Sequence, residues 1–198
     1  MPRISTPRCR SCALPAPLQT TDPFLCFGCV AEPLPVDWCE AWGEYRGTLE
    51  KVLQALKFRR HDFLDDALAG LLEERLRERA DLAFHAIVAV PMHRRRERRR
   101  GYNQAELLGR ALATRVGIPF DGRLLVRRHE GETQSTLPRA ARAANVRRAF
   151  VATPTAASKS ILLVDDICTT AETLRACATA LRKAGAARVC AVAVAKAT

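Results

Sequence analysis

Two adjacent carboxylates, Asp165 and Asp166, stand between a short apolar run and a series of threonines. The apolar run, residues 161–164, does not alternate with polar residues, which is typical of a strand buried on both faces of a parallel sheet. In open α/β sheets, ligands bind beyond the carboxyl ends of the strands, and free amides at the start of the next helix attract anions. The stretch therefore offers carboxylates to sugar hydroxyls or a metal ion, and amides to a phosphate. The alternative is a cap on an ordinary helix that binds no ligand.

Four cysteines near the N-terminus form two Cys-x-x-Cys pairs: Cys9, Cys12, Cys26 and Cys29. Four thiolates at this spacing meet the tetrahedral demand of a structural zinc ion. A segment this short cannot build a core of its own, so zinc binding would provide its folding energy, on the order of 10 kcal/mol. Disulfides or a redox pair are the alternatives. We expect a zinc-binding module over residues 1–35, a second domain over 36–198, and Cys39 packed as a small apolar residue.

A second concentration of charge follows another buried strand, which is predicted over residues 86–90. It consists of one glutamate and six arginines: Arg94, Arg95, Arg96, Arg98, Arg99 and Arg100. Because Asn103 is predicted to cap the next helix, the arginines are expected on a loop. If the strands are parallel, this loop meets Asp165 and Asp166 at one edge of the sheet. Crowded arginines repel one another unless anions are near, which favours contact with phosphate or nucleic acid over a merely solvated loop.

Strands and helices alternate along the second part of the chain. Helical apolar faces are predicted over residues 49–58 and 63–76, a short strand over 124–127, a helix ending at Gly185 and a last buried strand over 189–195. The charged face of the second helix is interpreted as solvated surface. Polar residues 130–148 are expected to form a mobile flap, with a surface helix over 138–148 as the alternative. The alternation predicts an α/β fold with a doubly wound, mostly parallel sheet.

The composition limits the class of protein. The chain has 198 residues, of which 48% are hydrophobic and 27% charged, as in ordinary globular proteins. Its net charge of +11 favours polyanionic partners such as nucleic acid, phosphorylated metabolites or anionic membranes. No run reaches the ~18 apolar residues of a membrane span, and the first residues lack the apolar core of a secretion signal. We therefore expect a cytoplasmic protein with reduced cysteines.

Residues 162–174 resemble the phosphoribosyl-pyrophosphate loop of type I phosphoribosyltransferases. In that family two adjacent acidic residues bind the ribose hydroxyls of the substrate, often through Mg²⁺, and a threonine-rich turn holds the 5′-phosphate on backbone amides. The resemblance assigns the ribose to Asp165 and Asp166. It assigns the phosphate to the turn that follows: Thr169, Thr170, Ala171, Glu172 and Thr173. The family usually has glycine where this chain has Ala171, whose Cβ restricts the turn.

Several further blocks, in the same order along the chain, are similar to ComF-type competence proteins. They include the paired cysteines and residues 45–49, 56–58, 91–93, 101–107 and 133–145. ComF-type proteins are linked to natural transformation, the uptake and handling of single-stranded DNA, and in some cases to the use of DNA as a nutrient. The resemblance therefore implies a type I phosphoribosyltransferase fold with an N-terminal zinc ribbon. It also implies three partners, which are phosphoribosyl pyrophosphate with Mg²⁺, single-stranded DNA and a DNA-translocating competence helicase.

If the protein is an enzyme, pyrophosphate leaves ribose C1, and the protein mainly positions the sugar and stabilises the charge on the leaving group. Asp165 and Asp166 are then the catalytic candidates, and His93 and Arg94 are further substrate-binding candidates. Contacts to pyrophosphate or nucleic acid are expected from a basic set with one aromatic residue: Arg95, Arg96, Arg98, Arg99, Arg100, Tyr102, Arg139 and Arg142. No residue stands out as a general base, and no motif indicates the acceptor. The alternative is a non-catalytic protein that uses the fold as a nucleotide or phosphate sensor and binds single-stranded DNA or recruits the helicase.

Overall fold

A computed structural model describes residues 3–4, 7–17, 19–21, 23–58, 63–79, 82–128, 149–169 and 171–197. A four-stranded parallel sheet lies at its centre, with the strands in the order β1-β6-β5-β2. The strands are β1 (Trp38–Glu44), β6 (Arg188–Lys196), β5 (Ser160–Cys168) and β2 (Ala86–Ala89). The three long apolar runs of the sequence are therefore strands of one sheet, as predicted.

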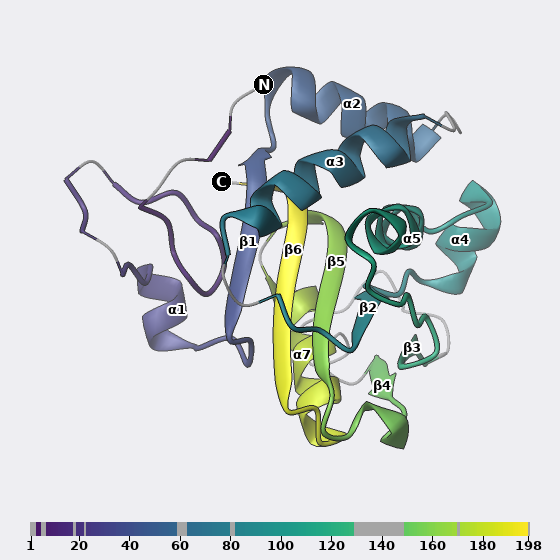
Figure 1. The fold of residues 1–198 in the computed structure, drawn as a ribbon. Coiled ribbons are helices and arrows are strands. Elements are labelled where there is room, and N and C mark those ends of the chain that lie inside the picture. Colours follow the sequence, from purple (N-terminus) through teal and green to yellow (C-terminus); the bar gives the residue numbers. More distant parts are fainter. Residues whose placement is uncertain are drawn as a thin grey trace, which may run out of the picture.

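Helices cover both faces of this sheet (Figure 1). One face carries α2 (Gly47–Phe58), α3 (Leu64–Arg77) and α5 (Gln104–Val116), and the other carries α7 (Glu172–Lys183). Strands buried on both faces need no alternation of apolar and polar residues, which explains their continuous apolar sequences. The predicted α/β fold with a doubly wound parallel sheet is confirmed.

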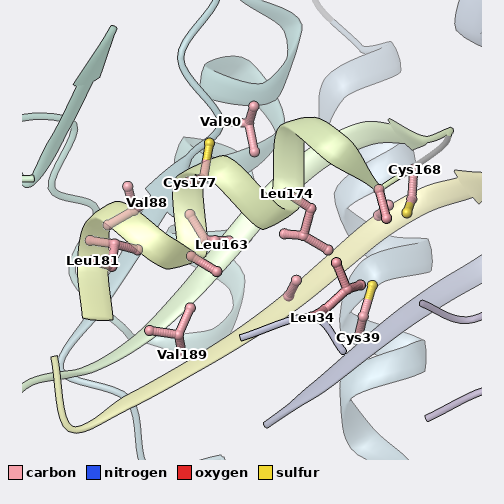
Figure 2. Close-up of a cluster of buried hydrophobic side chains, with 14 of the residues drawn as sticks. Leu34, Cys39, Val88, Val90, Leu163, Cys168, Leu174, Cys177, Leu181 and Val189 are labelled. Atoms are coloured by element: carbon pink, nitrogen blue, oxygen red, sulfur yellow. The ribbon is translucent and has the colours of Figure 1, made fainter. Parts of the chain in front are cut away.

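The core under α7 joins the sheet to the N-terminal part of the chain. Figure 2 shows three side chains of α7 above the sheet: Leu174, Cys177 and Leu181. They meet Leu163 of β5 and Val189 of β6, and all five side chains are buried. Cys39 of β1 belongs to the same cluster and is 1% exposed, so it packs as the small apolar residue that we predicted. The N-terminal residues of the cluster are Ile4, Cys9, Cys12, Ala13, Cys29 and Leu34.

Strand β1 is not predicted by the sequence pattern, because Glu40 interrupts it with a charge. In the structure Glu40 is 4% exposed. Arg8 pairs with it at 2.5 Å and Arg79 at 3.5 Å, so two cations from distant segments compensate for the buried carboxylate. This pairing also fixes the N-terminal segment against the edge strand of the sheet.

The prediction that the charged face of α3 is wholly solvated is wrong at Arg75, which is 1% exposed. Its guanidinium donates to the carbonyls of Ile4 (2.6 Å) and Trp42 (3.0 Å) and pairs with Glu78 at 2.7 Å. Burial lowers the pKa of Arg75, and the three partners offset that desolvation. Arg75 therefore connects α3, β1 and the N-terminal segment.

Smaller elements complete the fold. The predicted strand near residue 124 is β3 (Leu125–Arg127), which pairs antiparallel with β4 (Phe150–Ala152) in a separate two-stranded sheet. A 3₁₀ turn (Pro154–Ala156) precedes β5, and α1 (Phe27–Ala31) follows the second cysteine pair. The expected flap over 130–148 lies outside the described residues. Among the described residues, no helix has the length and apolar character that crossing a membrane requires.

Candidate functional site

The two carboxylates of the candidate site belong to β5 itself. We expected the strand to end before Asp165, but it continues to Cys168. Strand β2 stops at Ala89, which pairs with Val164, whereas β6 follows β5 as far as Lys196. Asp165 and Asp166 therefore lie within a strand but beyond the end of its neighbour. This leaves them at the carboxyl edge of the sheet, where ligands bind in open α/β folds.

Successive side chains of a strand point to opposite faces of the sheet, and the two aspartates follow this rule. Asp165 lines a small pocket on the α7 side together with Thr169, Ala171 and Thr173. Asp166 faces the other side, where its Oδ2 lies 3.3 Å from the Lys57 ammonium in the last turn of α2. The pair expected to hold one ribose is thus split between two environments.

Burial and a neighbouring charge perturb the carboxyl of Asp165. Its Oδ1 accepts a hydrogen bond from the Asp166 amide at 2.9 Å. Burial raises the pKa of Asp165 well above its usual range, and repulsion by the Asp166 carboxylate raises it further. Asp165 therefore favours the protonated form, while Asp166 has a cation beside it. Two neighbouring carboxyls in different environments are typical of functional sites.

The turn after β5 has the backbone conformation that glycine favours. Ala171 has φ 61° and ψ 1°, a left-handed conformation, and α7 begins at the next residue. The departure from the family pattern noted in the sequence therefore falls on a position where a side chain is strained. Thr169 is exposed, Glu172 and Thr173 open the helix, and Thr170 is not among the described residues.

Lys196, at the end of β6, stabilises this turn through hydrogen bonds. Its ammonium donates to the carbonyls of Cys168 (3.3 Å), Thr169 and Ala197 (2.8 Å). The residue is 5% exposed, so its positive charge lies directly behind the turn that is expected to bind phosphate. Because a buried ammonium strengthens the positive potential of a site, Lys196 adds to the attraction of the turn for anions.

The residues at this edge suit Mg²⁺, which usually takes one or two carboxylates and completes its shell with water and substrate phosphates. Among the described residues, Asp166 Oδ2 accepts no hydrogen bond and has only the Lys57 ammonium beside it. This buried oxygen therefore has acceptor capacity left for a divalent cation or a ligand hydroxyl. Asp165 faces away and does not share the position.

The predicted arginine loop is a helix, α4 (Arg94–Arg100), so that prediction is wrong. His93 caps it by accepting a hydrogen bond from the Arg95 amide at 3.1 Å, and Gly101 ends it in a left-handed conformation. Arginine is a good helix former, so a run of arginines does not by itself indicate a loop. Five of its arginines are exposed: Arg94, Arg95, Arg96, Arg98 and Arg99. Arg100 donates to Gln104 of α5 at 2.5 Å.

Helix α4 follows β2, which runs parallel to β5, so the arginines do emerge at the same edge of the sheet as the aspartates. Figure 1 shows α4 at the right of the view, beside α5. Tyr102 is partly buried, and its hydroxyl donates to the Leu56 carbonyl of α2 at 2.6 Å. Arg139 and Arg142 lie outside the described residues.

The four N-terminal cysteines come together as predicted, and their sulfurs all lie within 4.8 Å of one another. Cys12 and Cys26 are 3.7 Å apart, which matches the ~3.8 Å between sulfurs that surround a tetrahedral zinc at ~2.3 Å. A hydrogen bond with Cys12 lowers the pKa of Cys9 to about 4, whereas burial raises the pKa of Cys29 to about 11. A divalent cation would hold all four as thiolates, so the cluster fits a structural zinc ion.

The cysteine cluster adjoins the turn after β5. Arg175 of α7 donates to the carbonyls of Glu32 (2.8 Å) and Pro33 (2.6 Å), and the Cys168 thiol contacts the Cys12 carbonyl at 3.9 Å. A pocket of about 270 Å³ lies between the two parts, lined by Cys12, Cys26, Gly28, Thr169, Glu172 and Lys196. The N-terminal module therefore forms one wall beside the candidate phosphate turn.

Sequence reasoning missed Lys57 and Lys196 as site residues. Lys57 falls in the block 56–58 that carries the ComF-type resemblance, and this was the one signal that pointed to it. Lys196 ends an apolar strand and belongs to no motif. Only its position in the sheet, beside the turn after β5, shows that it supports this turn.

Comparison with known proteins places the chain in a family. A model of the phosphoribosyl transferase domain matches residues 102–198. The DNA utilization protein YhgH of Salmonella typhimurium is 33% identical over 186 residues, covering 91% of this chain and 80% of that protein. Competence protein F of Haemophilus influenzae is 33% identical over 170 residues, covering 81% of this chain and 73% of that protein. This chain belongs to the ComF family.

The ComF-type resemblance seen in the sequence is thereby confirmed, and the domain match agrees with the parallel sheet and the turn after β5. Among solved structures, the allosteric regulatory enzyme of purine biosynthesis is 23% identical, with a TM-score of 0.47 over 71% of this chain and 30% of that one.

Proposed function

We propose that this ComF-family protein binds phosphoribosyl pyrophosphate with Mg²⁺ at the carboxyl edge of its sheet and acts in the handling of DNA. The observation that carries the proposal is the pair Asp165 and Asp166 beyond the end of β2, followed by a left-handed turn and a helix N-terminus. Carboxylates accept from ribose hydroxyls, and the amides of the turn donate to the 5′-phosphate. The names of the relatives, a competence protein and DNA utilization proteins, support the role in DNA handling.

In this proposal the residues mostly position the ligand. Asp166 and Asp165 orient the ribose from the two sides of β5, and residues Thr169 to Thr173 hold its phosphate. The exposed arginines of α4 neutralise the pyrophosphate end. Mg²⁺, when bound at Asp166, would stabilise charge on the departing pyrophosphate. Whether the bound sugar is then transferred to an acceptor is a further step, for which no described residue serves as an evident general base.

Isothermal calorimetry with phosphoribosyl pyrophosphate and MgCl₂ tests the site. Asp165→Asn/Asp166→Asn should abolish measurable binding, because the site loses the Asp166 charge and both carboxyl groups that orient the ribose. Asp65→Asn/Asp66→Asn is the matched control, since it changes another adjacent pair in the first turn of α3. There Asp66 pairs with Arg115 in the last turn of α5, and neither aspartate belongs to the candidate site. Unchanged affinity in the first variant would remove the assignment of the site.

A specific observation also favours direct binding of single-stranded DNA. Five exposed arginines on the seven-residue helix α4 form a compact basic surface at the same edge of the sheet. Replacing them with glutamine should weaken binding and lower the slope of log K against log salt by roughly 0.7 for each DNA phosphate that the protein no longer neutralises. Arg77 and Arg123 are exposed outside α4, and their joint replacement is the control. Wild type that binds no DNA at low salt would exclude this second function.

A further inference from the structure

Lys57 makes a contact with the candidate site that no motif assigns. Its ammonium lies 3.3 Å from Asp166 Oδ2, and the two side chains are 23% and 15% exposed. Among the described residues, that oxygen accepts no hydrogen bond, so the ammonium is its evident source of compensation. The ion pair is largely withdrawn from water, where charges interact more strongly than at an open surface.

Two aromatic residues hold Lys57 in this position. The Tyr102 hydroxyl donates to the Leu56 carbonyl at 2.6 Å and fixes the last turn of α2. The Tyr45 ring, just beyond β1, lies 5.9 Å from the Lys57 ammonium, within cation–π range. The Tyr45 amide in turn donates to the Lys196 carbonyl at 2.8 Å, which ties this aromatic to the strand that supports the phosphate turn. Lys57 is therefore held by the fold, unlike a lysine that extends freely into solvent.

We infer that the Lys57 ammonium is a permanent positive charge of the site. It lies beside Asp166 and provides part of the positive charge that Mg²⁺ would otherwise supply to the ligand. This inference rests on the proposed binding of phosphoribosyl pyrophosphate and deepens it by naming a positioning residue. An ammonium has three donors, so Lys57 can keep Asp166 and still donate to an oxygen of the ligand.

Two opposite effects follow from one ion pair. The ammonium attracts a polyphosphate in the absence of any metal, so it reduces the dependence of ligand binding on Mg²⁺. It also cancels the charge of Asp166, so it weakens the attraction of that carboxylate for a divalent cation alone. A lysine with a merely structural role would produce neither effect.

The first experiment measures phosphoribosyl pyrophosphate affinity by calorimetry as a function of Mg²⁺ concentration. Without Mg²⁺, Lys57→Gln should bind at least about tenfold more weakly than wild type, because one charge-assisted hydrogen bond to the ligand is removed. Raising Mg²⁺ should bring the variant back toward wild type, and Lys57→Arg should stay close to wild type throughout. Lys51→Gln, which removes an exposed lysine from the same helix, should leave the affinity unchanged.

A second experiment uses the metal alone and needs no phosphoribosyl pyrophosphate. Mn²⁺ prefers carboxylate ligands as Mg²⁺ does and is detected by paramagnetic resonance. Lys57→Gln should bind Mn²⁺ more tightly than wild type, and Lys57→Gln/Asp166→Asn should lose that gain.

The two experiments separate the possible failures. If wild type fails to bind phosphoribosyl pyrophosphate at any Mg²⁺ concentration, the proposed function fails, while the Mn²⁺ gain in Lys57→Gln would still identify Lys57 as the cation of Asp166. If Lys57→Gln loses the same factor in affinity at every Mg²⁺ concentration and shows no Mn²⁺ gain, the inference is overturned and Lys57 only supports the fold.

Discussion

At the scale of single residues, Ala171 adopts a left-handed backbone conformation that alanine disfavours. With φ 61°, an alanine there is strained by roughly 1–2 kcal/mol relative to its relaxed conformation, whereas glycine adopts the angle freely. We expect Ala171→Gly to raise the free energy of unfolding by about 0.5–1 kcal/mol in denaturant titrations, because relief of strain outweighs the extra entropy of the unfolded chain.

Ala184 is the matched control for that substitution, since it caps the other end of α7 with φ −81°. Ala184→Gly should destabilise the protein, because an ordinary backbone angle gains nothing from glycine. Equal effects of the two substitutions would show that the turn at Ala171 is not strained.

The Asp165 carboxyl predicts an unusual dependence of stability on pH. Its pKa is raised in the folded protein by burial and by Asp166, so above the ordinary pKa of aspartate the unfolded chain binds fewer protons than the folded one. Stability due to this group is therefore full at low pH and is lost as the pH rises. Asp165→Asn should raise Tm near neutral pH, by about 2–4 °C for each kcal/mol gained, with the gain vanishing in acid.

Asp65→Asn is a suitable control for the Asp165 variant, because Asp65 also accepts a hydrogen bond from the following amide, at 3.0 Å, but at the protein surface. It should show no gain near neutral pH. A Tm gain for Asp165→Asn that persists unchanged in acid would contradict the raised pKa. Calorimetric scans of both variants and wild type across the pH range measure these differences in Tm.

Lys57 and Glu40 illustrate what single-residue sequence reasoning cannot reach. The two aspartates and the four cysteines are adjacent or regularly spaced, so their chemistry is visible in the sequence. The partner of Asp166 lies on α2, and the partners of Glu40 lie at Arg8 and Arg79. These pairs depend on how distant segments pack, which no local pattern contains.

At the scale of elements, strands of Val, Leu, Ile and Ala were predictable because burial on both faces leaves a continuous apolar run. Strand β1 and helix α4 were not, since both carry charges that the local pattern assigns to surface or loop. In each case a tertiary or capping interaction decides the outcome, such as the His93 cap of α4. The predicted order of elements from residue 86 onward nevertheless brings the aspartates and the arginines to one edge.

The end of strand β6 positions the phosphate turn through Lys196. Lys196→Met keeps the length of the side chain but leaves the Cys168 and Thr169 carbonyls without this donor. We expect a loss of about 1–3 kcal/mol in unfolding free energy and faster hydrogen exchange in the turn. Lys183→Met removes an exposed lysine from α7 and should change neither quantity. Unaltered hydrogen exchange in Lys196→Met would mean that the turn stays ordered without the hydrogen bonds from Lys196.

At the scale of the whole molecule, the N-terminal module and the sheet share one core. The division into residues 1–35 and 36–198 stays a prediction, but Cys9, Cys12 and Cys29 belong to the same buried cluster as Leu163 and Leu174. Arg175 adds hydrogen bonds from α7 to the segment that follows the second cysteine pair. Loss of order in the module should therefore reach the turn that is proposed to bind phosphate.

Removal of zinc tests this coupling. Elemental analysis of protein purified without chelator should find one zinc per chain, since four thiols share one cluster. Stripping the metal should lower Tm of the entire chain in one transition, because the thiolates that lose their cation lie in the common core. It should also accelerate hydrogen exchange in residues 169–173.

Arg175→Ala, with zinc retained, should reproduce the faster exchange without the large fall in Tm, because it removes the hydrogen bonds between module and α7 together with the 3.9 Å ion pair to Glu172 but leaves the zinc cluster intact. Two separate transitions, or a chelated protein with unchanged exchange in the turn, would show that the module and the site are independent.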